Sequence, residues 1–276
     1  MNKNYAVLGS PIAHSKSPAI HAAAYRVLGE DWNYSRFEVK KGALKRFIET
    51  QGSDLNGFSL TMPLKEEAFL YAQVIDESSS LTKTSNTLVR IDDQWHGFNT
   101  DIFGIVQAVG NQQVTQSLII GSGATATSAM VAVSRIAPGS SVMVFARNSK
   151  TRKILVEFGR ELGLSATVVR RLRKAITKSD LTISTLPGGA MDSTTKKIVD
   201  SRFFRPRGML LDVAYDPWPS QLAEAWMKQN IKVVSGLEML IWQAVAQIRI
   251  FKSGNPEAEL PNEIAVVQAM RIALEQ

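Results

Sequence analysis

The fold is decided by residues 117–126, which read Ser117-Leu118-Ile119-Ile120-Gly121-Ser122-Gly123-Ala124-Thr125-Ala126. An apolar strand leads here into a turn of the form G-x-G-x-x-A, and a helical segment follows. The first Gly permits the tight turn, the second lets the backbone approach a pyrophosphate, and the small third residue allows close helix–strand packing. The amides that open the helix then bind phosphate. This context predicts a dinucleotide site formed by Gly121, Ser122, Gly123, Ala124 and Thr125. The alternative is a glycine turn in an unliganded sheet.

Strand and helix patterns alternate on both sides of this stretch. In the second half we expect strands at 117–120, 141–146, 167–169, 181–184, 209–213 and 232–234, and helices at 125–135, 151–162, 172–177 and 221–228. Nearly continuous β-branched apolar strands favour a parallel sheet covered on both faces. The series therefore predicts an α/β fold with a doubly wound, Rossmann-like sheet.

The first half has the same alternation and precedes two long helices. We expect strands at 5–9, 32–39, 57–61 and 87–91, and helices at 18–28, 43–50, 65–72 and 101–109. The segments 237–251 and 261–274 read as helices with no strand after them. These last helices are expected to pack back on the first domain or to bridge two domains.

Composition bounds the class of protein. The chain has 276 residues, which is long enough for two modest domains or one large one. Hydrophobic residues make up 45% and charged residues 21%, which is ordinary for a soluble globular enzyme. It contains no Cys, so disulfides, thiolate metal sites and Cys nucleophiles are excluded. This fits a reducing cytoplasm, where we expect the protein, and a Cys-free secreted protein is the alternative. No apolar run suits a signal peptide or a membrane span. His14, His21 and His96 do not have metal-ligand spacing, so no metal site is expected.

The net charge of +7 has two interpretations. One is nucleic-acid binding, but the basic residues are spread out, and the densest cluster, residues 170–174, looks like a solvated helix start. The other is a positive field that favours anionic small molecules such as phosphates and carboxylates. We expect the second, with a small-molecule substrate and neither a nucleic acid nor a membrane as partner.

Two further segments carry a Lys and an Asp. In Gly57-Phe58-Ser59-Leu60-Thr61-Met62-Pro63-Leu64-Lys65, a short strand turns at Pro and presents Lys65 at the start of a helix. In Gly97-Phe98-Asn99-Thr100-Asp101, a loop presents Asp101 where a helix dipole favours an anion. A Lys/Asp pair beside a dinucleotide is the equipment of a nicotinamide-dependent oxidoreductase acting on a small polar substrate. The alternative is an exposed Lys and a helix-capping Asp.

The strand after the glycine loop predicts the choice of cofactor. NAD enzymes carry Asp or Glu near the end of this strand, whereas residues 146–152 read Ala-Arg-Asn-Ser-Lys-Thr-Arg. A guanidinium at Arg147 can bind the 2′-phosphate of NADP by charge and by a hydrogen-bonded fork. Asn148, Lys150 and Arg152 are the supporting candidates, and a solvated basic helix start is the alternative.

Near the N-terminus, Ser15 and Ser17 offer two hydroxyls in a strand-to-helix loop. They could hold a substrate carboxylate. Ser17 could equally cap the helix that begins at Pro18, and the residues alone leave both interpretations open.

Taken together, these motifs resemble the shikimate dehydrogenase family. The resemblance covers nearly the whole chain, in order and at family-like spacing. The Trp218-Pro219 step and the Ala146-Arg147-Asn148 segment look most like actinobacterial members. It rests on these sets: Gly9-Ser10-Pro11-Ile12 with His14, Ser15, Ser17, Pro18 and His21; Thr61, Pro63 and Lys65; Ser85-Asn86-Thr87; Asn99-Thr100-Asp101; Gly121 and Gly123; Asp212, Tyr215, Asp216 and Pro217; and Gly236-Leu237, Met239-Leu240 and Gln243.

The resemblance implies an activity and a set of site residues. Members reversibly reduce 3-dehydroshikimate to shikimate with NADPH, on the pathway to chorismate and aromatic amino acids. Lys65 and Asp101 would be the catalytic pair. The substrate would be held by Ser15, Ser17, Thr61, Asn86, Tyr215 and Gln243, and Thr185 and Gly236 would join the cofactor site.

It also implies a domain plan. Residues 1–101 would form the substrate domain, 102–236 the NADP domain, and 237–276 the C-terminal helices that return to the substrate domain. Family folds place the active site in the cleft. The oligomeric state expected is a monomer or a homodimer.

The chain departs from the family pattern in places. Ser59-Leu60-Thr61 stands where Asn-Val-Thr is frequent, Ala22 follows the motif His in place of Asn, and Ile183-Ser184-Thr185-Leu186-Pro187 replaces an Asn-Ala-Thr-Pro stretch. The glycine loop has Ala124 in place of a second Gly of a pair and lacks the Arg that often follows. The alternatives to an NADP enzyme are an NAD-preferring quinate/shikimate dehydrogenase and a non-catalytic dinucleotide sensor.

Overall fold

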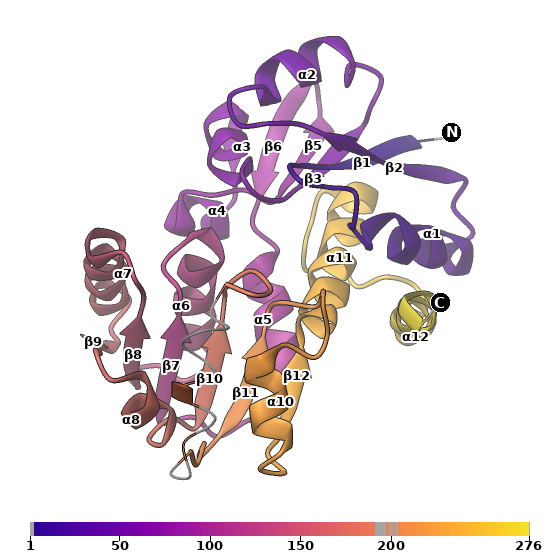
Figure 1. The fold of residues 1–276 in the computed structure, drawn as a ribbon. Coiled ribbons are helices and arrows are strands. Elements are labelled where there is room, and N and C mark those ends of the chain that lie inside the picture. The colour runs from indigo at the N-terminus through magenta and orange to yellow at the C-terminus, as the bar shows by residue number, and fades with distance from the viewer. Residues whose placement is uncertain (1–2, 191–196, 199–200, 202–203, 276) are drawn as a thin grey trace. The chain divides into compact units, whose positions relative to one another are not determined.

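The computed structural model describes residues 3–190, 197–198, 201 and 204–275. The chain forms two compact units. Unit 1 comprises Met1–Gly104 with Leu240–Gln276, and unit 2 comprises Ile105–Met239. The chain passes from unit 1 to unit 2 within α5 (Asp101–Val109) and returns within α11 (Gly236–Ser253) (Figure 1). The domain boundaries expected from the sequence remain a prediction.

Unit 1 is built on a mixed sheet. Its strands are β1 (Lys3–Gly9), β2 (Trp32–Glu38), β3 (Gly57–Leu60), β4 (Val74–Ile75), β5 (Thr87–Ile91) and β6 (Gln94–Phe98), in the order β2-β1-β3-β5-β6-β4. β1 is parallel to β2 and β3, whereas β5 is antiparallel to β3 and β6. The helices are α1 (Ser17–Leu28), α2 (Leu44–Thr50), α3 (Lys65–Tyr71) and α4 (Glu77–Thr82), with α11 and α12 (Glu263–Glu275) from the chain's last segment.

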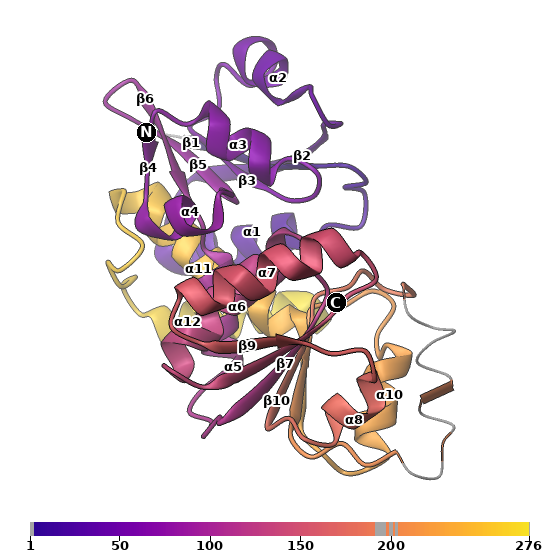
Figure 2. The same ribbon diagram turned by 90° about the vertical axis from the view of Figure 1, so that its left-hand side faces the viewer.

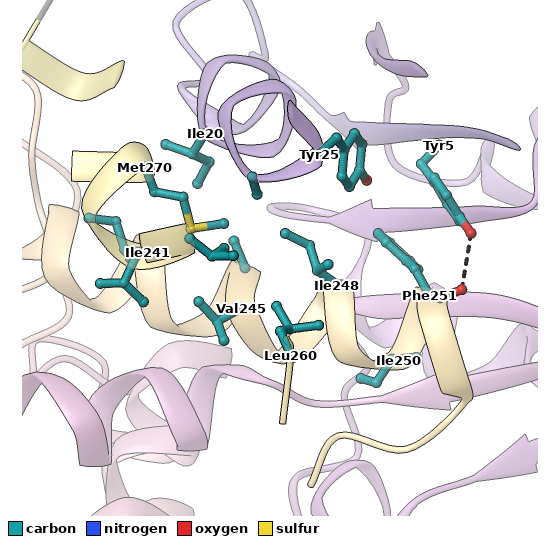
Figure 3. Close-up of a cluster of buried hydrophobic side chains, with 14 of the residues drawn as sticks. Tyr5, Ile20, Tyr25, Ile241, Val245, Ile248, Ile250, Phe251, Leu260 and Met270 are labelled. Carbon is teal, nitrogen blue, oxygen red and sulfur yellow. Dashed lines mark hydrogen bonds between the residues drawn. The ribbon is translucent and has the colours of Figure 1, made fainter. Parts of the chain in front are cut away.

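Alternating residues of β1 point into two cores. Tyr5 belongs to a cluster with α1, α11 and α12, whereas Ala6 and Leu8 belong to a cluster with α2 and α3. This alternation follows from the period of two of a β-strand. Figure 3 shows the first cluster, where the Tyr5 hydroxyl also donates to the Phe251 carbonyl oxygen at 3.1 Å. The expected return of the last helices to the first domain is confirmed by this packing.

Unit 2 is built on the parallel sheet that the sequence predicts. Its strands are β7 (Gln116–Ile120), β8 (Ser141–Phe145), β9 (Ser165–Val168), β10 (Leu181–Ser184), β11 (Met209–Asp212) and β12 (Val233–Ser235), in the order β12-β11-β10-β7-β8-β9. Every pairing in this sheet is parallel. The strand order runs from β7 to β8 and β9 on one side and from β7 to β10, β11 and β12 on the other. In a doubly wound sheet, a ligand binds at the carboxyl ends of the strands where the order reverses, which is here the carboxyl end of β7.

Helices cover both faces of this sheet. Figure 2 shows α6 (Ala124–Ile136) and α7 (Ser149–Glu161) on one face, and α8 (Leu172–Ile176) and α10 (Gln221–Met227) on the other. Leu118 and Ile120 of β7 pack on the α8 and α10 side, together with Trp226. Strands buried on both faces explain why their sequences read as apolar runs.

Among the elements whose bounds the structure describes, the sequence did not predict β4, α4 and β6. The β5–β6 hairpin turns at Asp92 and Asp93, whose φ angles are 46° and 61°. Two positive φ angles are typical of a two-residue hairpin turn, but that turn is usually marked by Gly. The Asp-Asp pair therefore gave no signal for β6. The other differences are shifts of one or two residues at element ends.

Candidate active site

Lys65 is positioned by the carboxyl ends of β1 and β3. The Thr61 amide donates to the Leu8 carbonyl oxygen at 2.9 Å, and the Thr61 carbonyl accepts from the Leu64 amide at 2.9 Å. A methyl group on Gly9 would lie 2.3 Å from Thr61 Cγ2 and 3.1 Å from the Met62 carbonyl oxygen, so glycine at this position allows the ends of β1 and β3 to pack closely. The resulting turn begins α3 at Lys65.

Asp101 and Asn86 meet because β5 and β6 are antiparallel. Asn86 immediately precedes β5 and Asn99 immediately follows β6, where Thr87 pairs with Phe98. Asn86 Nδ2 donates to Asp101 Oδ1 at 2.8 Å and to Thr100 Oγ1 at 2.9 Å. The Asp101 amide, at the start of α5, donates to Asn99 Oδ1 at 3.1 Å. The orientation of the Asp101 carboxylate is therefore set by its neighbours along the chain and across the hairpin.

Lys65 and Asp101 form an ion pair of 2.5 Å between Nζ and Oδ2. Their side chains are only 13% and 5% exposed, so the interpretation as an exposed Lys and a simple capping Asp does not describe this pair. One carboxylate oxygen faces Lys65 and the other faces Asn86. Because an ammonium has three N–H donors, Lys65 keeps donors for a ligand oxygen while Asp101 holds it.

Gln243 of α11 lies beside this pair. Its Oε1 is 3.5 Å from both Asn86 Nδ2 and Thr100 Oγ1, and its Nε2 donates to the Leu240 carbonyl oxygen. Unit 1 thus gathers Lys65, Asn86, Asp101 and Gln243, four predicted site residues that are far apart in the sequence.

Ser15 and Ser17 lie in the loop after β1 and at the first residue of α1. The N-cap position is Lys16, which makes no side-chain capping bond, and the Ser17 amide donates to Ser15 Oγ at 3.3 Å. Ser17 is buried, and its hydroxyl interacts with the phenol of Tyr34. The alternative in which the Ser17 side chain caps the helix is therefore not what the structure shows, and the carboxylate grip remains a prediction.

Two residues implied by the resemblance belong to unit 2. Tyr215 is half-buried in the loop after β11, where desolvation and the nearby Asp216 raise the pKa of its phenol. Gly236 begins α11, and a methyl group there would lie 2.0 Å from the Val213 carbonyl oxygen. Close backbone packing is thus a sufficient reason for glycine at position 236.

The glycine loop of unit 2 lines a cavity of about 330 Å³. Gly121, Ser122 and Gly123 form one wall, and Phe145, Arg147, Asn148 and Leu186 are among the other lining residues. Ala124 and Thr125 are the first residues of α6, which begins after Gly123. Thr185 lies beside Gly121 at the end of β10 and donates to the Ile120 carbonyl oxygen. The structure thus brings most of the predicted cofactor residues to the carboxyl end of β7.

Gly123 provides a test of whether this loop suits a dinucleotide. A methyl group on Gly123 would meet no atom of the described residues within 4 Å. The protein itself therefore does not require glycine at this position. A pyrophosphate approaching the backbone does require it, so the residues present fit the cofactor.

The basic segment after β8 divides into different roles. Arg147 is exposed and lines the cavity. Asn148 caps α7, its Oδ1 accepting from the Lys150 and Thr151 amides at 3.0 and 3.2 Å. Lys150 is exposed, whereas Arg152 donates to the Ala146 carbonyl oxygen at 2.9 Å. Arg147 is thus the cation best placed for a phosphate, and Arg152 is held by the backbone.

Sequence reasoning missed several residues of these sites. Thr100 lies within a quoted motif, yet its contacts to Asn86 and Gln243 follow from tertiary packing. Thr151 was not assigned, although its hydroxyl lies 2.7 Å from Ser122 Oγ in the glycine loop. Its position facing that loop could have been inferred from the expected start of the helix after β8.

Other classes of function find no support in the described residues. The described part of the chain holds no group of three or more His, Asp or Glu side chains arranged as a metal site. Among the helices of the described residues, none combines the length and apolar character needed to cross a membrane.

Comparisons with known proteins agree with this geometry. Residues 7–88 match the family model described as the shikimate dehydrogenase substrate binding domain. The shikimate dehydrogenase (NADP(+)) of Thermus thermophilus is 30% identical over 274 residues, covering 98% of each chain. That of Leptospira interrogans is 28% identical over 268 residues, covering 93% of this chain and 91% of the relative.

Solved structures extend the match over both units. The crystal structure of Mycobacterium tuberculosis shikimate dehydrogenase has a TM-score of 0.85 and 35% identity, covering 98% of this chain and 99% of that one. A Thermus thermophilus shikimate 5-dehydrogenase in complex with NADP(H) and shikimate has a TM-score of 0.80 and 26% identity, with coverage of 98% and 99%. With its mixed and parallel sheets, its Lys/Asp pair and these full-length matches, the chain belongs to the shikimate dehydrogenase family.

Proposed function

We propose that this chain is an NADP-dependent shikimate dehydrogenase, which reversibly reduces 3-dehydroshikimate to shikimate on the route to chorismate and aromatic amino acids. The observation that carries the proposal is the buried Lys65–Asp101 ion pair, held by Asn86 in a chain that matches NADP-dependent relatives over nearly its whole length. A cytoplasmic location and a monomeric or homodimeric state are part of the proposal and rest on the sequence.

The substrate contacts follow from chemistry that the side chains can perform. Ser15 and Ser17 offer hydroxyl donors for the substrate carboxylate. Thr61, Asn86 and Gln243, with Tyr215, offer donors and acceptors for ring hydroxyls. Their proposed roles are supported by the family resemblance and, in unit 1, by the clustering of Asn86 and Gln243 around Asp101.

The reaction requires a proton at the ketone oxygen. NADPH, when bound, supplies the hydride for the ketone carbon. The Lys65 ammonium donates a hydrogen bond to that oxygen, stabilises the negative charge that develops there, and delivers a proton. Asp101 holds the ammonium in place and accepts a hydrogen bond from the resulting hydroxyl. In the reverse direction Lys65 receives the proton.

The cofactor would be held in unit 2. The loop from Gly121 to Thr125 would receive the pyrophosphate at the start of α6. Arg147 would bind the 2′-phosphate, with Asn148, Lys150, Arg152, Thr185 and Gly236 as the further proposed contacts. The open space beside Gly123 and the cavity lined by Arg147 support this assignment.

The test is turnover of the purified chain. Shikimate with NADP should produce the absorbance of reduced nicotinamide, and NAD at the same concentration should produce much less. Comparable rates with NAD and quinate would favour the quinate/shikimate alternative. Tight NADP binding without any turnover would favour the dinucleotide sensor and contradict the proposal.

A further inference from the structure

A network of hydrogen-bonded polar side chains, here called the polar network, reaches Asn86, the residue that holds Asp101. It begins at Gln247, one turn beyond Gln243 on α11 and 1% exposed. Ser59 Oγ donates to Gln247 Oε1 at 2.7 Å, and Gln247 Nε2 donates to the Asn86 carbonyl oxygen at 3.4 Å. One amide side chain therefore contacts both β3 and the residue that orients Asp101.

The polar network continues from Ser59 to Ser17, which the proposed function places at the substrate carboxylate. The Tyr34 hydroxyl of β2 donates to Ser59 Oγ at 2.7 Å. The Tyr34 phenol also interacts with the hydroxyl of Ser17, and its ring stacks on His21 with centroids 3.8 Å apart. Ser17, Tyr34, Ser59, Gln247 and Asn86 are thus connected through side chains and one backbone carbonyl.

Burying these polar groups costs free energy unless each finds a hydrogen-bond partner. A buried amide or hydroxyl without a partner is destabilising, so the buried Ser59 hydroxyl and the Gln247 amide depend on each other for a hydrogen bond. Ser59 also stands where the resemblance leads one to expect Asn. A hydroxyl is shorter than a carboxamide, and Tyr34 and Gln247 both reach Ser59 from neighbouring elements.

We propose that Gln247 is a positioning residue, which with Ser59 and Tyr34 sets the distance between the catalytic pair at Asp101 and the carboxylate grip at Ser17. The inference rests on the proposed function, because it assigns Lys65, Asp101 and Ser17 the roles given there. Gln247 acts through Asn86: its hydrogen bond holds the Asn86 backbone, and the Asn86 side chain holds Asp101. Tyr34 acts through Ser17.

Substitutions at the two ends of the polar network, Gln247 and Tyr34, should affect different kinetic constants. Gln247→Leu should lower kcat about 10–100-fold, because displacements of about 1 Å at reacting groups have effects of that size. Tyr34→Phe should mainly raise the KM for shikimate, because it removes the hydroxyl next to Ser17 and keeps the ring on His21. Neither change should alter the KM for NADP, since the cofactor residues are in unit 2. The factor by which kcat/KM falls in the double variant should be smaller than the product of the two single factors, because both residues act in one connected polar network.

Ile248→Ala is the matched control. Ile248 is the next residue on α11, is fully buried, and belongs to the hydrophobic cluster around Tyr5, with no polar side-chain atom of its own. This control should lower the melting temperature and leave the kcat of the folded enzyme unchanged. Thermal unfolding and active-site concentration, measured for every variant, separate lost fold from lost rate.

The outcomes are distinguishable. If the wild type turns over shikimate and Gln247→Leu behaves like Ile248→Ala, with lowered stability and normal kcat, the inference is overturned and the proposed function stands. If Gln247→Leu lowers kcat without changing the KM for NADP, the inference is supported. A folded wild type without turnover would remove the proposed function and this inference together.

Discussion

At the scale of single residues, the Lys65 ammonium has the decisive position. It is largely shielded from water and is held by one oxygen of a carboxylate whose other oxygen is fixed by Asn86. Such an arrangement fixes the position of the Lys65 ammonium, and its remaining N–H donors stay available for a ligand oxygen. The chemistry proposed for it therefore depends on geometry that one substitution can remove.

Lys65→Ala should lower kcat by roughly 10²–10⁴, the usual contribution of a positioned acid–base group. The KM for shikimate should change much less, because Ser15, Ser17 and Gln243 remain. Steady-state kinetics on protein shown to be folded by circular dichroism would measure both constants. Near-normal turnover in that variant would exclude Lys65 from the mechanism.

Arg147 should determine cofactor preference. NADP should be preferred over NAD by at least about tenfold in kcat/KM, which is about 1.4 kcal/mol in the transition state. Arg147→Ala should narrow this ratio through weaker NADP binding, because the 2′-phosphate loses its guanidinium partner. Lys153→Ala, an exposed cation further along α7, is the control and should leave the ratio unchanged. Equal use of both cofactors by the wild type would contradict the prediction.

At the scale of elements, the loop between β7 and α6 contains two glycines with different reasons for being glycine. Gly121 has a φ of 121°, and a methyl group there would lie 2.2 Å from Thr185 Oγ1. Gly123 has a φ of −96°, which any residue tolerates, and open space where a methyl group would be. One glycine serves the fold of unit 2, and the other leaves room for a ligand.

These glycines form a matched pair of substitutions. Gly121→Ala should destabilise the protein by about 1–3 kcal/mol, through backbone strain and the clash with Thr185. Gly123→Ala should keep the melting temperature and weaken NADP binding by about tenfold or more, because the methyl group occupies the approach of the pyrophosphate. Calorimetry of NADP binding alongside thermal unfolding would separate the two effects. Unimpaired NADP binding by Gly123→Ala would count against the assignment of this loop.

At the scale of the whole molecule, the return of the last segment of the chain completes the core of unit 1. Ile241, Val245 and Ile248 of α11 pack with Tyr5 and Tyr25, as Figure 3 shows. His21 lies at the margin of this packing, fully buried, with Nδ1 3.1 Å from the Tyr25 hydroxyl. Burial lowers the pKa of His21 to about 3, and the neighbouring Gln247 side chain opposes that shift.

This pKa makes global stability depend on pH. The unfolded chain protonates His21 near its reference pKa of 6.5, whereas the folded chain does so only near 3. The unfolded state therefore binds more protons in this window, and stability falls as the pH drops from 6.5 towards 3. Between pH 7 and pH 4 the loss due to His21 should be on the order of 3 kcal/mol.

Urea unfolding at pH 7 and pH 4 would measure the effect. In His21→Phe, which keeps an aromatic ring beside Tyr34, the decrease between the two pH values should be smaller than in the wild type by about that amount. An identical decrease in both proteins would show that other groups cause the acid sensitivity.

Much of this protein could be predicted from its sequence, because the relevant interactions are local. The strand, glycine turn and helix at 117–126, the parallel sheet of unit 2 and the return of the terminal helices were confirmed, since hydrophobic periodicity and turn chemistry are written in neighbouring residues. The Lys/Asp pair was expected from two loop motifs, and the structure places its two side chains in contact.

Other features were decided only by the tertiary structure. The β5–β6 hairpin turns on an Asp-Asp pair with no glycine signal, yet it is this hairpin that places Asn86 beside Asp101. Gln247 contacts Ser59 and Asn86 across more than 150 positions of sequence, a distance that no local pattern spans. The sequence by itself indicated the elements with strong hydrophobic periodicity and the groups that carry chemistry, and it did not indicate β4, α4 or β6. Only the pairing of β5 with β6 and the packing of α11 against the sheet decided which buried polar groups meet, because those contacts depend on long-range burial and hydrogen-bond satisfaction.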